Sequence, residues 1–199
     1  MTQKHDLAAL VASRICHDLI SPIGAIGNGV ELMAMEAGGP ARPELSLIAE
    51  SVANANARIR FFRISYGAAG QDQRIARSEV LSILTDLGRS GRLGYAWTSS
   101  GDLSRRDVRL IFLLLQCLET ALAYGGRIDV TEGPSGWTVL AEATRLKYDA
   151  DLWRCLTDAS AFVEIVAGMV HFALAADDLA TRGVTLRTEV TDRSISLSF

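Results

Sequence analysis

Residues 15–26 read Ile-Cys-His-Asp-Leu-Ile-Ser-Pro-Ile-Gly-Ala-Ile, and this stretch lies within a long helical pattern. From about Leu7 to Met35, apolar residues recur every three or four positions, which is the period of a helix with one buried face. Pro22 lacks a backbone N–H, so we expect it to remove one hydrogen bond and to kink the helix. The breakers in residues 37–43, Ala-Gly-Gly-Pro-Ala-Arg-Pro, are expected to end it.

A second helical pattern runs from about Glu44 to Tyr66 and ends at the glycines of residues 67–70. Because the connection is short, the two helices should be antiparallel neighbours, and residues 1–68 are predicted to form a helical hairpin domain. Two helices cannot cover each other's apolar faces well. A four-helix bundle in a homodimer would bury them, and packing of the hairpin on the rest of its own chain is the alternative.

Residues 71–199 show a mixed pattern and are predicted to form a second domain. Helices are expected at about residues 78–87, 105–124, 149–156 and 161–179. Strands are expected at about residues 95–98, 127–131, 137–143, 184–190 and 194–199. The turn residues 133–136, Gly-Pro-Ser-Gly, join two of these strands as a hairpin. The sum is an α/β sandwich in which helices cover one face of a mixed sheet, and the whole chain is of the α+β class.

Composition excludes several classes of function. The 199 residues carry a formal net charge of −3, which argues against nucleic acid as a partner because nucleic-acid binders normally show a basic stripe. Cys16, Cys117 and Cys155 stand far apart among apolar neighbours. That pattern predicts buried free thiols in a reducing compartment. No CxxC or HxxxH spacing is present, so a structural zinc site is not expected.

The sequence also argues against a membrane protein. Residues 1–6 are polar, without the apolar core of a signal peptide. The most apolar run, Leu110 to Tyr124, is interrupted by Gln116 and Glu119 and is shorter than the ~20 residues that a membrane span needs. We therefore expect a soluble, cytoplasmic protein.

The pair His17-Asp18 carries the candidate chemistry. An imidazole beside an acid on an exposed helical face can take a phosphoryl group from an aspartyl phosphate and pass it to another aspartate. In this interpretation His17 is the nucleophile, and Asp18 holds its tautomer or accepts a proton. The alternative is a surface histidine beside an ordinary surface acid.

Neighbouring residues are candidates for binding the partner protein. On the first helix they are Ile20, Ser21, Gly24 and Asn28, which share or adjoin the face of His17. Gly24 would leave room for another protein beside the histidine, whereas Gly27 and Gly29 suit close packing between helices. On the second helix the candidates are Asn54, Ala57 and Arg58.

Two arginines of the second helix are candidates for stabilising a phosphoryl group. In an antiparallel hairpin, the level of His17 should face roughly Arg63, and Arg60 lies one turn away. The planar set of donors on arginine suits a phosphoryl group. Solvated surface arginines are the alternative.

His17, Asp18 and Pro22 within a helical period resemble the phosphoacceptor helix of sensor histidine kinases. The longer sequence of residues 17–26, followed by Asn28-Gly29 and Glu31-Leu32, resembles the corresponding sequence of the ChpT histidine phosphotransferases more specifically. The resemblance covers both parts of the chain. It implies a homodimer with one acceptor histidine per subunit, in which the hairpins form a four-helix bundle. It also implies that residues 71–199 form a sandwich like the ATPase (Bergerat) domain of histidine kinases.

The resemblance further implies a middle place in a bacterial cell-cycle phosphorelay. Phosphate would arrive from the receiver domain of a hybrid histidine kinase of the CckA type. It would leave for response regulators, among them a transcription factor of the CtrA type. The receivers would supply their own magnesium, so no cofactor or metal of the chain itself is expected.

The sandwich lacks the residues with which a kinase domain of this fold holds ATP. Gln116 and Thr120 stand where two asparagines would be expected, although Glu119 is a further candidate for magnesium or base chemistry. The chain reads Thr-Arg-Leu-Lys-Tyr-Asp over residues 144–149, where a glycine-rich phosphate loop should follow the strand, and no glycine lies between Gly136 and Gly168. We expect a degenerate domain that binds no ATP.

Three hypotheses therefore stand side by side. The first is a histidine phosphotransferase that carries a phosphoryl group on His17 between receiver aspartates. The second is an active kinase that uses ATP. The third is a dimeric adaptor that binds receivers without accepting phosphate, for which the histidine-acid-proline spacing would have no purpose.

Overall fold

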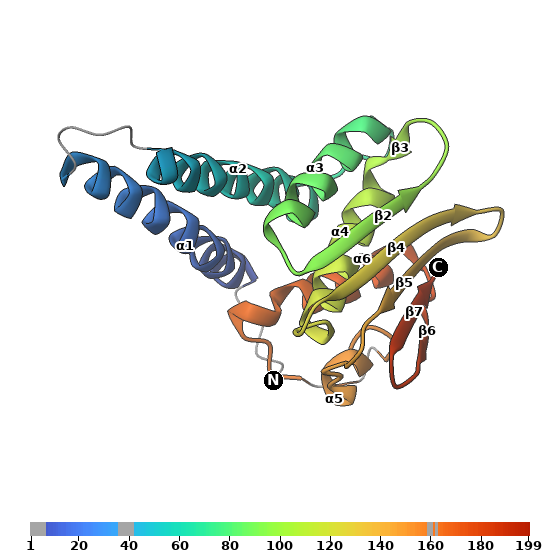
Figure 1. Cartoon of the computed structure of the whole chain (residues 1–199). Coiled ribbons are helices and arrows are strands. Elements are labelled where there is room, and N and C mark those ends of the chain that lie inside the picture. The colour runs from blue at the N-terminus through green and yellow to red at the C-terminus, as the bar shows by residue number, and fades with distance from the viewer. Residues whose placement is uncertain (1–6, 36–41, 159–160, 162) are drawn as a thin grey trace.

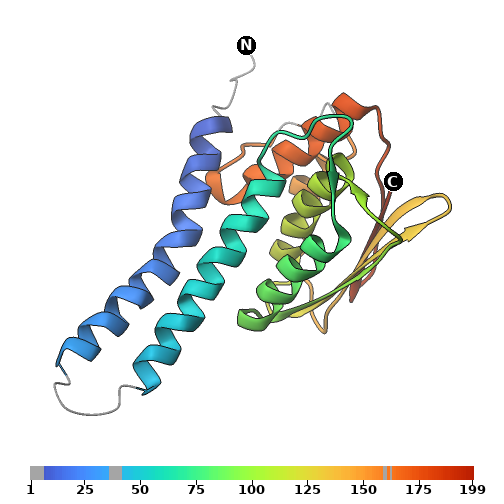
Figure 2. The same cartoon turned by 90° about the horizontal axis from the view of Figure 1, so that it is seen from above.

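The computed structural model describes residues 7–35, 42–158, 161 and 163–199, and it begins with the two predicted helices. α1 (Leu7–Met35) and α2 (Arg42–Ser65) run antiparallel side by side, and their connected ends point away from the rest of the molecule (Figures 1 and 2). α1 continues through Pro22 as one helix. The turn predicted over residues 36–41 lies outside the described residues. Arg42 and Pro43, predicted as breakers, instead begin α2, where the fixed φ of proline suits a first turn.

The rest of the chain folds as the predicted sandwich. Its elements are β1 (Arg74–Ile75), α3 (Arg77–Ser90), β2 (Leu93–Thr98), β3 (Leu103–Ser104), α4 (Arg105–Ala121), β4 (Gly126–Gly133), β5 (Gly136–Glu142), α5 (Ala150–Arg154), the 3-10 helix η1 (Ala167–Met169), α6 (Val170–Arg182), β6 (Arg187–Val190) and β7 (Ser194–Ser198). The five-stranded sheet has the order β2-β4-β5-β7-β6. β2 and β4 are parallel, joined through α4, and the other neighbours are antiparallel. α3, α4 and α6 lie between this sheet and the hairpin (Figure 2).

One predicted helix was too long. The expected helix over residues 161–179 begins only at Val170, after η1, and ends at Arg182, where Gly183 caps it with a left-handed φ of 63°. Residues 163–166 carry no helix, and Ile165 from this segment is buried in the core. The β-branched side chains of Val163, Ile165 and Val166 explain the difference, because they lose rotamer freedom in a helix.

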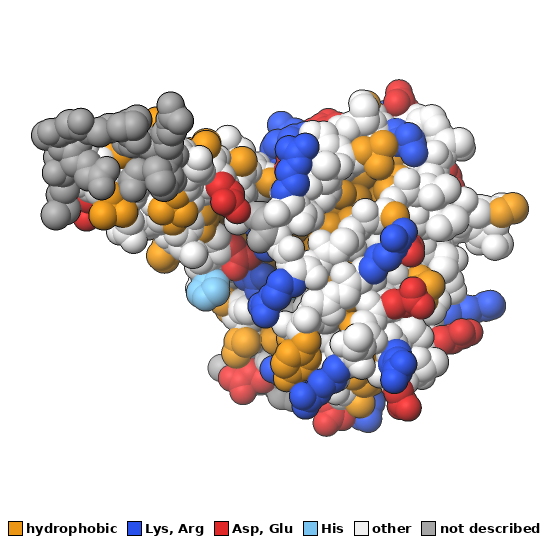
Figure 3. All heavy atoms as spheres, viewed as in Figure 1, with side chains coloured by type: hydrophobic (Ala, Val, Ile, Leu, Met, Phe, Trp, Pro, Cys, Tyr) orange, Lys and Arg blue, Asp and Glu red, His pale blue; other side chains and the backbone are white. Residues whose placement is uncertain are grey.

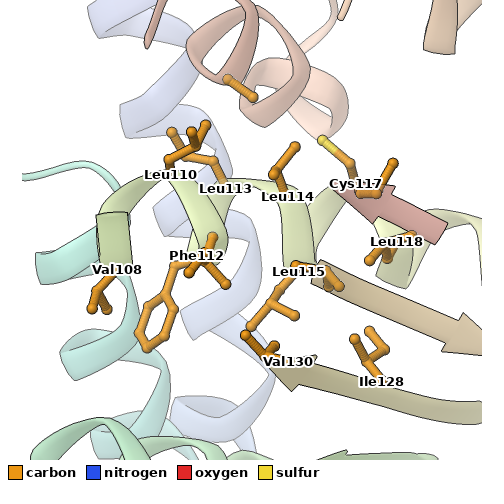
Figure 4. Close-up of a cluster of buried hydrophobic side chains, with 14 of the residues drawn as sticks. Val108, Leu110, Phe112, Leu113, Leu114, Leu115, Cys117, Leu118, Ile128 and Val130 are labelled. Carbon is orange, nitrogen blue, oxygen red and sulfur yellow. The ribbon is translucent and has the colours of Figure 1, made fainter. Parts of the chain in front are cut away.

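α4 is enclosed on all sides. Its residues from Leu110 to Leu118 are all buried, as expected of a helix that is apolar around its whole circumference. Figure 4 shows the residues that meet on the sheet side of α4: Leu115, Leu118, Ile128 and Val130. The opposite side packs against α2 and α6.

The hairpin shares this core. Phe61 of α2 stacks on Phe112 of α4 with ring centroids 4.6 Å apart, and Phe62 and Ile64 are also buried. The second half of α2 is therefore part of the sandwich, which is the packing that we weighed against dimerisation. The first half of α2, together with α1, still exposes apolar side chains, so packing within one chain does not cover the hairpin.

The three cysteines are free, as predicted, but they are not all buried. Cys117 is buried and Cys155 half-buried, whereas Cys16 is exposed. The expectation for Cys16 was wrong because it was based on apolar neighbours along the sequence. On a helix, the next residue points about 100° away.

α1 is also a candidate membrane span by its length and hydropathy. From Leu7 to Met33 it is long and apolar enough to cross a membrane by length and composition, with a mean hydropathy of 1.3. One such helix is weak evidence for a membrane span, because the core helix of a soluble protein or a signal sequence has the same length and composition. The helix carries the charged residues Arg14 and Asp18 and packs against α2.

His171 of α6 is fully buried, and neither ring nitrogen has a hydrogen-bond partner among the described residues. Burial, and to a smaller extent the nearby Arg14 guanidinium, lowers the pKa of this imidazole to about 3. The folded protein therefore keeps His171 neutral, while the unfolded chain protonates it below about pH 6.5.

Because of this difference in pKa, we predict that His171 makes the folded protein less stable in acid. A histidine whose pKa falls on folding destabilises the native state as the pH drops from about 6.5 towards 3. Between pH 7.5 and 5, the wild-type protein should lose about 2 kcal/mol more unfolding free energy than His171→Leu. Urea unfolding of both proteins at the two pH values measures this. Parallel losses would show that His171 is protonated in the fold or that water reaches it.

Candidate functional site

His17 lies on the outer face of α1, where its side chain is 85% exposed. Its Nδ1 is 3.1 Å from Oδ1 of Asp18. An ionised carboxylate only accepts hydrogen bonds, so we assign the tautomer in which Nδ1 carries the proton and donates a hydrogen bond to Asp18. The lone pair of the neutral ring is then on Nε2, and the exposed side chain leaves the imidazole accessible to a partner.

Asp18 is held more firmly than the histidine it contacts. Its side chain is 11% exposed, and Oδ2 accepts a hydrogen bond from Nε of Arg14 at 3.0 Å. The same guanidinium donates through Nη1 to the backbone carbonyl of Gly168 in η1, at 2.8 Å. A continuous chain of contacts therefore leads from the sandwich through Arg14 and Asp18 to His17.

Sequence reasoning missed Arg14. The signal was present, because an arginine four residues before an aspartate is a neighbour on the same helical face. We considered only the residues that follow His17. The link from Arg14 to Gly168 spans 154 positions, and no local pattern indicates it.

The predicted partner-binding residues of α1 lie on the surface. Ile20 is 69% exposed, and Ser21, Gly24 and Asn28 are also exposed. A Cβ added to Gly24 would meet no atom within 4 Å, so packing within this chain does not require glycine there. The surface beside His17 is open, and apart from Ile20 these predicted residues have small side chains or, at Gly24, none. Binding by these residues stays a prediction.

The predicted residues of α2 face the sandwich instead. Arg60 bonds to Asp86 at 3.2 Å and Arg63 to Glu79 at 2.6 Å, both acids of α3. Both arginines thus already have a carboxylate partner, and their role towards a phosphoryl group stays a prediction.

The receiver contacts predicted on α2 are less accessible than those on α1. Arg58 is half-buried, with Nη1 3.8 Å from the carboxylate of Glu119. Asn54 is half-buried, and Ala57 is only 1% exposed. Ala57 packs in the core and therefore offers no surface to a partner.

Gln116 and Thr120, where the resemblance to kinases led us to expect asparagines, make hydrogen bonds within the chain. Gln116 is 1% exposed. Its Oε1 accepts from the hydroxyl of Tyr66 at 2.6 Å, and its Nε2 donates to the Phe112 carbonyl at 3.2 Å. Thr120 donates to the Cys117 carbonyl at 2.7 Å. These polar groups join α4 to itself and to α2.

Glu119 is held in a similar way. Its carboxylate accepts a hydrogen bond from the hydroxyl of Tyr95 at 2.7 Å and lies beside Arg58. Burial, with the Glu119 charge adding to it, raises the pKa of the Tyr95 hydroxyl, so the phenol stays protonated and remains a donor. Among the described residues, no group of three or more His, Cys, Asp or Glu side chains is arranged to hold a metal ion.

Comparison with known proteins agrees with this geometry. Residues 77–194 match the model of the histidine phosphotransferase C-terminal domain. The chain belongs to this family.

Two individual proteins are also similar to this chain. Protein phosphotransferase ChpT of Brucella abortus (strain 2308) is 39% identical over 127 residues, which are 63% of this chain and 60% of that protein. A solved structure of a bacterial phosphotransferase matches with a TM-score of 0.82 and 30% identity, over 100% of this chain and 97% of the other. The resemblance to the ChpT proteins is thus confirmed, and so is the predicted α+β architecture.

The open surface at Gly24 gives a testable prediction for this family member. Gly24→Ala should raise the unfolding free energy by about 0.5–1 kcal/mol, because alanine is the better helix former and its Cβ meets nothing. For a protein of this size that corresponds to an increase in Tm of about 1–4 °C. Gly24→Leu should also fold, since the site is exposed.

If a partner packs beside His17, the same two variants should impair the reaction in order of size. We expect Gly24→Leu to slow phosphoryl transfer from a receiver more than Gly24→Ala, although neither variant is less stable than wild type. Thermal melts and transfer rates measured on the same preparations check both parts. Full transfer by Gly24→Leu would contradict close approach of a partner at this position.

Proposed function

We propose that this protein is a histidine phosphotransferase of a multistep phosphorelay, with His17 as the phosphoryl carrier. The observation that carries the proposal is the exposed imidazole of His17, whose Nδ1 is held by Asp18. Membership of the histidine phosphotransferase family supports it. An adaptor without phosphoryl chemistry would gain nothing from this arrangement.

The chemistry needs little from the protein beyond positioning. The lone pair on Nε2 of His17 attacks the phosphorus of an aspartyl phosphate. The N–P bond forms as the P–O bond to the aspartate breaks, and the carboxylate leaves with the bonding electrons. The ring keeps its Nδ1 proton and becomes positively charged, and the Asp18 carboxylate at 3.1 Å stabilises that charge. The reverse step delivers the phosphoryl group to a second aspartate.

We propose further that the protein does not draw phosphate from ATP. Gln116, Glu119 and Thr120 all make hydrogen bonds within the chain, which supports this view. Rebuilding a magnesium site from them would leave the hydroxyls of the half-buried Tyr66 and Tyr95 without their present acceptors, which is costly. Magnesium for the transfer would come from the receiver domains.

The partners proposed are receiver domains, which would dock on the exposed face of α1 beside His17. By resemblance to the ChpT proteins, the donor is a hybrid kinase of the CckA type and the acceptors include a regulator of the CtrA type. The proposed setting is a cell-cycle phosphorelay in the cytoplasm.

A label-transfer assay tests the function. The protein is given labelled ATP alone, or a labelled phospho-receiver, and the second lane is repeated with His17→Ala. We expect label from the receiver, no label from ATP, and loss of label in the variant. His171→Leu is the matched histidine control and should accept label as wild type does.

Any other result of the label-transfer assay would contradict this proposal. Label taken directly from ATP would establish a kinase. Label accepted by His17→Ala would exclude His17 as the carrier. A protein that binds the phospho-receiver but takes no label from it would be an adaptor.

We also propose that two copies of the hairpin pair as a four-helix bundle. Exposed residues on α1 recur every seven positions: Cys16, Ile23 and Val30. Exposed residues on α2 recur every seven positions: Leu45, Val52 and Ile59. Figure 3 shows hydrophobic side chains along the exposed helical arm. Stripes with this period are typical of helices that pack in bundles.

Dimerisation also accounts for the apolar character of α1 without a membrane. The face that carries Ile23 and Val30 would be covered by the second copy, while His17 and Asn28 lie on the neighbouring face and stay open to receivers. This arrangement places the polar site of α1 in water. We therefore propose a soluble dimer.

One substitution on the apolar stripe should separate the subunits. Val52 is 40% exposed, so Val52→Glu should leave the monomer folded but place a charge in the bundle. We expect light scattering to show a dimer for wild type and a monomer for Val52→Glu at micromolar concentration. Val190→Glu, at a valine of 41% exposure on β6, is the matched control and should stay dimeric. A monomeric wild-type protein, or a dimeric Val52→Glu, would contradict the bundle.

A further inference from the structure

We infer that Arg14 is a positioning residue for phosphoryl transfer, which acts by holding Asp18 against Nδ1 of His17. The inference rests on the proposed function and adds to it a residue outside the His-Asp pair. It also assigns a role to the sandwich, which supplies the acceptor that fixes Arg14.

The contact between His17 and Asp18 requires help from a third group. Consecutive residues on a helix do not face each other, so the Asp18 carboxylate must turn towards His17 to reach it. Arg14, one turn before Asp18, binds Oδ2 and leaves Oδ1 for the imidazole. The two oxygens of one carboxylate are thus divided between the guanidinium and the ring. Without Arg14, water would compete for Oδ2, and the side chain would be free to rotate.

Arg14 is itself fixed at its other end. Nη1 donates to the Gly168 carbonyl at 2.8 Å, while Nε serves Asp18, and the side chain is only 19% exposed. A guanidinium is planar and rigid, so bonds at two of its nitrogens determine its orientation. Gly168 lies in η1, immediately before α6. The position of this segment therefore determines where the acid beside His17 is held.

Arginine is suited to this role for a geometric reason. A lysine at position 14 retains a positive charge near Asp18, but its single ammonium lacks the fork that reaches a carboxylate and a carbonyl in fixed directions. Arg14→Lys should therefore restore only part of the function that Arg14→Ala loses. An arginine that served only as a nearby charge would be replaced fully by lysine.

The first test reads the state of the imidazole directly. Nitrogen NMR of the wild-type protein, at a pH where His17 is neutral, should show the proton on Nδ1. In Arg14→Ala the proton should be shared between the two nitrogens, because Asp18 no longer selects one tautomer. A wild-type ring that carries its proton on Nε2 would overturn the inference, whatever the variants do.

The second test is a double-mutant cycle on the rate of transfer from a labelled phospho-receiver. Arg14→Ala and Asp18→Ala should each lower the rate by roughly tenfold or more, as expected when a residue that orients a reacting group is lost. Because Arg14 acts through Asp18, the double variant should be no slower than Asp18→Ala alone. Losses that multiply would show that Arg14 acts independently, for example on the phosphoryl group.

The control is another arginine with the same kinds of partner. Arg182 pairs with the carboxylate of Asp107 and donates to the carbonyl of Arg106, and its side chain is 14% exposed. Arg182→Ala should lose stability without changing the tautomer of His17. A shift of the tautomer in Arg182→Ala would mean that general loosening of the fold explains the result.

The two levels of proposal fail in different ways. If His17→Ala still accepts label, the proposed function is wrong. If His17→Ala is inactive but Arg14→Ala transfers at the full rate with an unchanged ring, only the role of Arg14 is wrong.

Discussion

The stacking of Phe61 on Phe112 fixes the relation between the two parts of the molecule. α4 is apolar around its circumference, so it needs a cover on the side that the sheet does not reach, and the second half of α2 provides part of that cover. α2 is thereby rigidly attached to the sandwich. α1 pairs with α2 and is fastened to the sandwich once more through Arg14 and Gly168. The helix that carries the histidine is therefore held by contacts with α2 and with η1.

What could be predicted from the sequence was mainly local. The 3.6-residue period gave both long helices, and the turn at residues 133–136 gave the β4–β5 hairpin. The pairing of His17 with Asp18 needed only adjacent residues. The roles of Arg60, Arg63 and Ala57 depend instead on which face of α2 turns towards α3 and α4. The packing of Phe61 and Phe62 determines which face of α2 turns towards α3 and α4, and no sequence pattern within α2 predicts it.

The differences in the C-terminal part have a similar cause. Residues 161–169 contain enough apolar side chains to imitate the helical period, but Ile165 is drawn into the core from an extended segment. That segment leads into η1, whose Gly168 carbonyl receives Arg14. A continuous helix from residue 161 would have used this carbonyl in its own hydrogen bonds. The structural detail that sequence reasoning missed is thus the same one that connects the sandwich to the site.

Two polar residues of α4, Gln116 and Glu119, also take part in attaching the hairpin to the sandwich. Where the resemblance to kinases places an asparagine, Gln116 accepts a hydrogen bond from Tyr66 of the hairpin. Glu119, one turn on, is paired with Arg58 of the same helix α2 and with Tyr95. A kinase must let its ATPase domain move relative to the acceptor helix, because the γ-phosphate has to reach the histidine. A carrier that receives phosphate from another protein has no such requirement. In the proposed carrier, the polar groups at these positions can therefore hold the two parts together, and leaving that state would cost these part-buried hydrogen bonds.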